Sequence, residues 1–242
     1  MGQVYKPNLA ISTEIIVKIL DQIRRDVRSA TLTTEKFDLI LFGSYLTLSY
    51  VISLRGSEGL MLDLTTMRRE LDRSQEFCWI ALRGKVKGES NERDHLFPCC
   101  NLTKSGIDVR LWIKSLVLAH KCLNREGGPA ITTSRGVLLS MSALDLSLHR
   151  YLSLLHQAGV EFPPEIKGED DIYDRFSMYR SVRRASNTRA LNQGISPNDI
   201  DVVNRWKSVE AAQGTKPGRQ MRQHYAESAL LKEPFLRYTR SM

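Results

Sequence analysis

An arginine-rich stretch is the first feature of this 242-residue chain that could do chemistry. Between residues 175 and 189 it holds five arginines, and no acidic residue follows them until Asp199. They are Arg175, Arg180, Arg183, Arg184 and Arg189. A solvated helix face usually mixes signs, because opposite charges three or four residues apart stabilise a helix and like charges destabilise it. The stretch therefore predicts arginines that bind an anion.

The net charge of +8 is confined to the same end of the chain. Residues 175–242 hold 13 Lys and Arg against 5 Asp and Glu, whereas residues 1–174 hold 22 of each. Excess charge gathered in one region is typical of a polyanion site.

A second candidate is "SLRGSEGLMLDL", in which Arg55 lies at the end of an apolar run. An isolated guanidinium there would be costly to desolvate, and Glu58 is its natural partner. From this segment alone, a structural Arg–Glu pair at a helix end is the plainer interpretation. The downstream arginines favour a functional one.

Five segments, in this order, resemble the catalytic domain of the tyrosine recombinase (phage integrase) family. "LRGSEGLMLDL" resembles its Arg-x-x-Glu motif and "GKVKGESNERDHLFP" the hairpin that carries its lysine. "RSVRRASNTRALNQGIS" resembles its His-x-x-Arg box, "NRWKS" its His or Trp position, and "MRQHYAES" the segment of its nucleophile. The resemblance implies catalytic roles for Arg55, Lys87, Arg183, Trp206 and Tyr225, with Glu58 and Arg180 supporting them.

The sequence departs from the family at two places. Arg180 stands where the family usually has His or Lys, so the role of a base at that position is open. Trp206 and Tyr225 are farther apart than is usual, and the glycine-rich "QGTKPG" accounts for this as an insertion, as in mobile-element members with an extended loop.

These residue types suit phosphodiester cleavage. Attack concentrates negative charge on nonbridging oxygens, and two guanidinium forks such as Arg55 and Arg183 would stabilise it. A tyrosine hydroxyl, with an ordinary pKa near 10, is a better nucleophile beside arginines that favour its anion. A phosphotyrosyl intermediate would conserve the bond energy, so we expect no cofactor and, by the resemblance, no metal. Trp206 is either a core aromatic or an indole N–H donor to phosphate.

Two assignments have rivals within the sequence. Lys85 and Lys87 would share one face of a strand, so periodicity cannot choose the general acid between them. Counting back from "ERDHLFP" favours Lys87. Tyr225 competes with Tyr238, which lies in the tail, and with Tyr179, which abuts the arginine box.

The elements that must position these residues are mostly helices. We expect two helices within residues 12–54, the second apolar nearly all round, and a β-hairpin at about 77–100. We expect further helices at 105–123 and 140–159, a loop at 160–171, the basic helix ending at Gly194, a helix from Ser196-Pro197, and a last one around 221–232. The fold class is therefore mainly α with a small antiparallel β-sheet (α+β). By the resemblance, we expect a fold like that of the recombinase catalytic domain, as one domain spanning 1–242, with no separate core-binding domain evident.

The function that this pattern favours is a site-specific DNA recombinase or integrase of a mobile element, active in DNA integration or transposition through a 3′-phosphotyrosyl intermediate. Alternatives are a catalytically inactive DNA-binding descendant and a type IB topoisomerase-like enzyme. The expected partner is double-stranded DNA, with self-assembly on it as a dimer or tetramer. Further DNA-binding residues are Lys85, Arg184, Arg189, Lys207, Arg219 and Arg222.

Cysteine usage and hydropathy predict the compartment. The four cysteines show no paired CxxC spacing, which favours reduced thiols over a metal site. The longest uncharged stretch, residues 39–54, is shorter than the roughly 20 residues of a membrane span. We therefore expect an intracellular protein without a membrane partner, in the nucleus of a eukaryote or the cytoplasm of a prokaryote.

Overall fold

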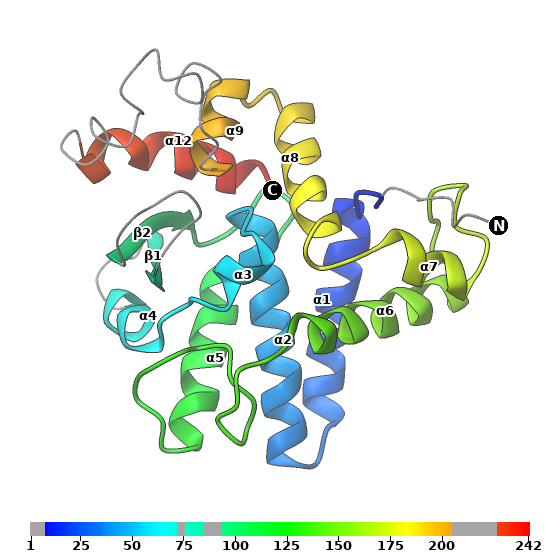
Figure 1. Cartoon of the computed structure of the whole chain (residues 1–242), viewed down its shortest axis with the longest axis horizontal. Helices are drawn as coiled ribbons and strands as arrows, with labels where there is room; N and C mark the ends of the chain where they lie inside the picture. Colours follow the sequence, from blue (N-terminus) through cyan, green and yellow to red (C-terminus); the bar gives the residue numbers. More distant parts are fainter. Residues whose placement is uncertain (1–7, 72–75, 85–92, 205–226) are drawn as a thin grey trace.

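Helices surround one β-hairpin in the computed structural model, which describes residues 8–71, 76–84, 93–204 and 227–242 (Figure 1). The helices are α1 (Thr13–Ser29), α2 (Thr33–Val51), α3 (Gly56–Gly59), α4 (Leu64–Leu71), α5 (Val109–Cys122), α6 (Met141–Gln157), α7 (Glu169–Arg175), α8 (Ser181–Asn192), α9 (Pro197–Asn204) and α12 (Glu227–Ser241). The strands β1 (Phe77–Gly84) and β2 (Arg93–Cys100) pair antiparallel, with Phe77 opposite Cys100. The predicted fold class is confirmed.

Helix α2 is the centre of the core, with α1 and α5 on either side of it (Figure 1). Its side chains from Leu41 to Val51 are all buried, which explains why the sequence is apolar on every face. Gly43 lets α5 approach, because a Cβ at this position would lie 2.3 Å from the ring of Trp112.

Side-chain caps and a glycine define several helix ends. The hydroxyl of Ser12 accepts a hydrogen bond from the Ile15 amide and caps α1. Ser196 does the same for Asp199 at the start of α9. Gly194, with φ of 78°, follows the end of α8.

The C-terminal helix α12 packs on the hairpin and on α8 and α9. Its Phe235 ring lies 5.3 Å from that of Phe97 on β2. The Thr239 hydroxyl accepts from the Cys100 amide, and the Ser105 amide donates to the Met242 carbonyl. The segment that contains Tyr238, expected to be a tail, is therefore packed against the rest of the protein.

The structure corrects three details of the sequence-based prediction. The acidic end of the loop expected at 160–171 is helical, since α7 begins at Glu169 with acids in its first turn. The sequence offers Thr33 or Thr34 as a cap for the second helix, but helix α2 begins at Thr33 with Leu32 as its N-cap and no side-chain cap. Helices α3 and α4 were not predicted, because segments this short give little periodic signal.

No helix within the described part of the chain is both long and apolar enough to cross a membrane.

Candidate active site

Arg55 is held at the N-terminus of the short helix α3 by Glu58. The Glu58 carboxylate accepts from the Arg55 amide at 2.8 Å and from its guanidinium at 2.7 Å. The Glu58 side chain is only 3% exposed. The Arg–Glu pair that the sequence suggested therefore forms, and one carboxylate fixes both the backbone and the side chain of Arg55.

Two glycines allow helix α3 to pack closely against neighbouring side chains. A Cβ on Gly59 would lie 2.5 Å from the Tyr45 ring, and one on Gly56 would lie 2.7 Å from the side-chain methyl of Met141. The Tyr45 hydroxyl donates to the Gly56 carbonyl at 2.9 Å. Because burial raises the pKa of the Tyr45 phenol, it stays protonated as this donor. Helix α3, and Arg55 with it, is thereby anchored on α2.

Arg183 reaches the same place from α8. Its guanidinium donates to the Ser53 carbonyl at 3.0 Å and to the Asn204 carbonyl at 2.9 Å. Ser53 and Arg183 are 130 residues apart, so only the tertiary fold brings them together.

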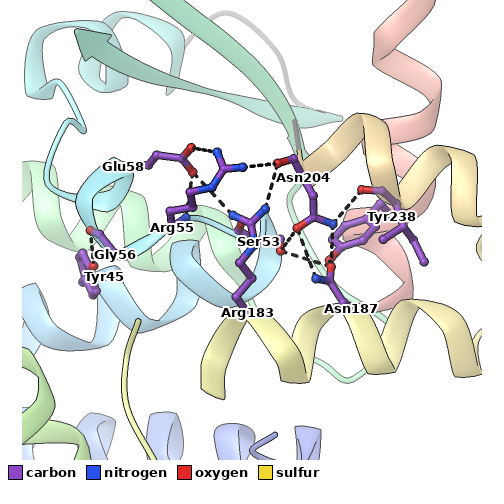
Figure 2. A network of polar contacts seen from close by, with 10 residues as sticks. Tyr45, Ser53, Arg55, Gly56, Glu58, Arg183, Asn187, Asn204 and Tyr238 are labelled. Atoms are coloured by element: carbon purple, nitrogen blue, oxygen red, sulfur yellow. Dashed lines mark hydrogen bonds and ion pairs between the residues drawn. The ribbon is translucent and has the colours of Figure 1, made fainter. Parts of the chain in front are cut away.

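The two guanidiniums converge on one carbonyl and one carboxylate, as Figure 2 shows. The Asn204 carbonyl also accepts from Arg55 at 3.4 Å, and the Glu58 carboxylate lies 3.9 Å from Arg183. The Arg55 and Arg183 side chains are 18% and 11% exposed. Among the residues that the structure describes, the two cations and one anion of this cluster carry a formal charge of +1 in a largely desolvated place, where electrostatic interactions are strong.

A network of amides and hydroxyls that was not predicted from the sequence lies beside this cluster (Figure 2). The Asn187 and Asn204 side-chain amides donate to each other's oxygens, at 3.3 and 2.8 Å. The Ser53 hydroxyl donates to the Asn204 oxygen at 2.8 Å, and the Tyr238 hydroxyl donates to the Asn187 oxygen at 2.8 Å. One available signal was that Asn187 follows Arg183 by one helical turn and so shares its face.

The other arginines of the basic stretch lie outside the cluster. Arg180 is exposed at the N-cap of α8, over the Tyr179 ring. Arg184 is exposed and donates to the Asn8 carbonyl. Arg189 is half-buried and donates to the Ser241 carbonyl at 3.3 Å. Arg184 and Arg189 thus support neighbouring chain segments, whatever else they bind.

Several candidates lie outside the described residues and stay predictions. They are Lys85, Lys87, Trp206, Lys207, Arg219, Arg222 and Tyr225. Of the rival tyrosines, Tyr238 is fully buried, and its hydroxyl also lies 2.7 Å from that of Ser186, whereas Tyr179 is half exposed. The cysteines are free thiols, of which only Cys122 is exposed.

Sequence comparisons identify no relative, since no family model and no curated protein matches the chain. Among solved structures, the fold is similar to that of a XerH site-specific recombinase bound to a palindromic difH substrate in a post-cleavage complex. The TM-score is 0.55 at 12% sequence identity, and the match covers 93% of this chain and 53% of that one. The chain thus spans about half of the length of that recombinase. At this identity the match shows a shared fold.

Proposed function

We propose that this chain is the catalytic domain of a tyrosine recombinase that cleaves and rejoins duplex DNA through a 3′-phosphotyrosyl intermediate. Arg55 and Arg183 bind the scissile phosphate, and Tyr225 is the nucleophile. The observation that carries the proposal is that the guanidiniums of Arg55 and Arg183 converge, as two arginines that bind one phosphate would have to.

Charge and geometry of the cluster support a phosphodiester as its ligand. A phosphodiester carries one negative charge, which matches the formal +1 of Arg55, Arg183 and Glu58. Guanidiniums present fixed N–H forks, so two of them can contact different oxygens of one phosphate. In a largely desolvated site these contacts strengthen as charge builds up in the transition state.

The remaining roles rest on the resemblance and on chain order. Trp206 follows Asn204 by two residues, and Asn204 is the residue whose carbonyl binds both arginines. Tyr225 precedes α12, which packs against α8 and α9. Lys87 protonates the leaving 5′ oxygen as general acid, with Lys85 as its rival.

The presence of both arginines in one cluster favours strand cleavage over DNA binding alone, and the fold, shared with a site-specific recombinase, is compatible with either. Recombination joins two sites, so protomers assemble on DNA as a dimer or tetramer. The glycine-rich "QGTKPG" between Trp206 and Tyr225 associates the chain with mobile-element members of the family.

A covalent adduct on DNA tests the proposal. A randomised duplex pool is first selected for binding to the chain, and the recovered sequence is prepared with a nick that prevents religation. With chelator present, the chain should become linked to a 3′ end, giving a species that resists denaturant and is removed by protease. Tight, sequence-specific binding without any adduct would instead identify a DNA-binding descendant.

A sulfur-substituted substrate identifies the general acid. Replacing the 5′ leaving oxygen by sulfur removes the need for a proton, because a thiolate leaves unprotonated. Lys87→Ala should therefore cleave the ordinary duplex slowly and the sulfur duplex at the wild-type rate. If Lys85→Ala shows this rescue and Lys87→Ala does not, the assignment within the hairpin is wrong by two residues.

A further inference from the structure

We infer that the buried network formed by Ser53, Asn187 and Asn204 positions the Arg55–Arg183 pair, and that Tyr238 couples α12 to that network. This inference rests on the proposed function, since it assigns positioning residues to the same reaction. Asn187 and Asn204 lie within segments that resemble recombinases, but the resemblance assigns no role to any of these four residues.

Within the described part of the chain, Arg183 donates to the carbonyls of two residues that belong to the network. The Ser53 carbonyl accepts from Arg183, and the Ser53 hydroxyl donates to the Asn204 side chain. The Asn204 carbonyl accepts from Arg183 and Arg55, while its side-chain amide pairs with Asn187. A change in the Asn187–Asn204 amide pair is therefore expected to move the Ser53 and Asn204 carbonyls, which accept hydrogen bonds from the two guanidiniums.

The hydrogen bonds of the network allow the Asn187 and Asn204 side chains few other orientations. The two amides donate to each other, which fixes both side chains, and the Asn204 amide also donates to the Ile200 carbonyl at 2.7 Å. Ser53 and Asn204 are fully buried. Buried polar groups that are mutually satisfied hold a single arrangement, because any other would leave a desolvated donor or acceptor.

Ser53 adopts an uncommon backbone conformation at this place, with φ of 51°. A non-glycine residue in the left-handed region persists only where its surroundings hold it, and such residues cluster at functional sites. Here the conformation presents the carbonyl of Ser53 to Arg183 and its hydroxyl to Asn204.

Tyr238 extends the network to the helix that follows the proposed nucleophile. Its hydroxyl donates to Asn187 at 2.8 Å and lies 2.7 Å from the Ser186 hydroxyl. The same helix ends in contacts with the segment after β2, through the carbonyls of Arg240 and Met242. The chain from Asn204 to Tyr238, which contains Tyr225, is thus tied at both ends to residues that hold the arginines.

The test replaces the whole network by apolar groups of similar shape. The triple variant Ser53→Ala, Asn187→Leu, Asn204→Leu removes the partners together, so that few buried polar groups are left unsatisfied and stability is largely kept. Tyr238 keeps its bond to Ser186 in this variant. The control is Thr13→Val with Tyr50→Phe, which removes a buried hydroxyl pair of 2.7 Å between α1 and α2.

The readouts are the single-turnover rate of adduct formation on the selected nicked duplex, the DNA dissociation constant and the melting temperature. The triple variant should form adduct on the order of 10- to 100-fold more slowly, since small displacements of catalytic groups cost this much. Its DNA affinity should stay within about 2-fold of wild type, because positioning acts on the transition state. The control should cleave at the wild-type rate. The sulfur duplex should not rescue the triple variant, unlike Lys87→Ala.

The outcomes separate this inference from the function on which it rests. If wild type forms adduct, Arg183→Ala does not, and the folded triple variant cleaves as fast as wild type, the positioning role is overturned and the function stands. If wild type itself forms no adduct on a tightly bound site, both fall. Should the triple variant not fold, Tyr238→Phe is measured instead, because it removes the hydrogen bond from Tyr238 to Asn187. If this variant has a melting temperature like that of the control and cleaves at the wild-type rate, the positioning role of the network is overturned.

Discussion

At the scale of single residues, Glu58 is the group on which the candidate site depends. It is almost fully buried and binds the amide and the guanidinium of Arg55, with Arg183 3.9 Å away. Without its charge, two guanidiniums would face each other in a place that water hardly reaches.

Glu58→Gln should therefore lower the free energy of unfolding by about 3 kcal/mol or more, the usual cost of breaking a buried ion pair. Urea unfolding measures this. Glu126→Gln is the matched control, because Glu126 is 72% exposed in its pair with Arg68 and should contribute less than about 1 kcal/mol. If the two substitutions lowered the free energy of unfolding equally, Glu58 would not be the buried partner that stabilises Arg55 and Arg183.

Neighbouring arginines of α8 provide a test of the phosphate-binding role. Arg183→Ala should reduce the rate of adduct formation on the order of 100-fold or more, as loss of a transition-state donor does. Arg184→Ala should leave that rate nearly unchanged, because Arg184 is exposed and lies outside the cluster. Single-turnover cleavage at saturating protein gives both values. A larger loss for Arg184→Ala would place the phosphate elsewhere on the helix.

Residue types and spacing predicted part of this site. The Arg55–Glu58 contact followed from a spacing of one helical turn and from the cost of an unpaired guanidinium near the core. The amide pair of Asn187 and Asn204 did not, because it depends on how α8 packs against α9. Nor could the sequence show that the Asn204 backbone, rather than a side chain, joins the two arginines.

At the scale of elements, helix α2 shows that the pattern of apolar residues predicts which helix is central. A helix apolar on every face has to be central, and α2 is packed by α1, α5 and α8. The short helices α3 and α4 were not predicted, because their length is set by tertiary contacts. Helix α3 is one turn long and is held by Glu58 and by the Tyr45 hydroxyl.

Close packing of α2 on α5 gives a test at this scale. Gly43→Ala should destabilise the fold by about 1–3 kcal/mol, the usual cost of overpacking, because the new Cβ would overlap the Trp112 ring. Gly168→Ala is the control, since a Cβ there meets nothing within 4 Å. Thermal and urea unfolding of the two variants would show whether α2 and α5 approach as closely as described; similar stabilities would contradict it.

At the scale of the whole molecule, the charge distribution separates a balanced part of the chain from a basic part. Residues 1–174 are balanced, and the excess of eight positive charges lies in residues 175–242. The described arginines of that region include two in contact with chain carbonyls outside the cluster, Arg184 and Arg189. Part of the positive charge of this region is therefore already engaged within the chain and is not wholly available to the proposed DNA partner.

Binding to a fluorescently labelled duplex should depend steeply on salt. If about four phosphates are neutralised, affinity should fall on the order of 100-fold between about 50 and 200 mM salt. Fluorescence anisotropy at several salt concentrations gives the slope. An affinity that stays flat over this range would contradict a nucleic-acid partner.

Identifying the amino acid that bonds to DNA tests the central claim most directly. The adduct formed on the nicked duplex is digested with nuclease and protease, and the modified peptide is sequenced by mass spectrometry. We expect the nucleotide on Tyr225, and we expect Tyr225→Phe, which removes only a hydroxyl, to bind DNA without forming adduct. Tyr179→Phe and Tyr238→Phe should still form it, the latter more slowly. A nucleotide found on Tyr238 or Tyr179, or an adduct that survives Tyr225→Phe, would contradict the assignment.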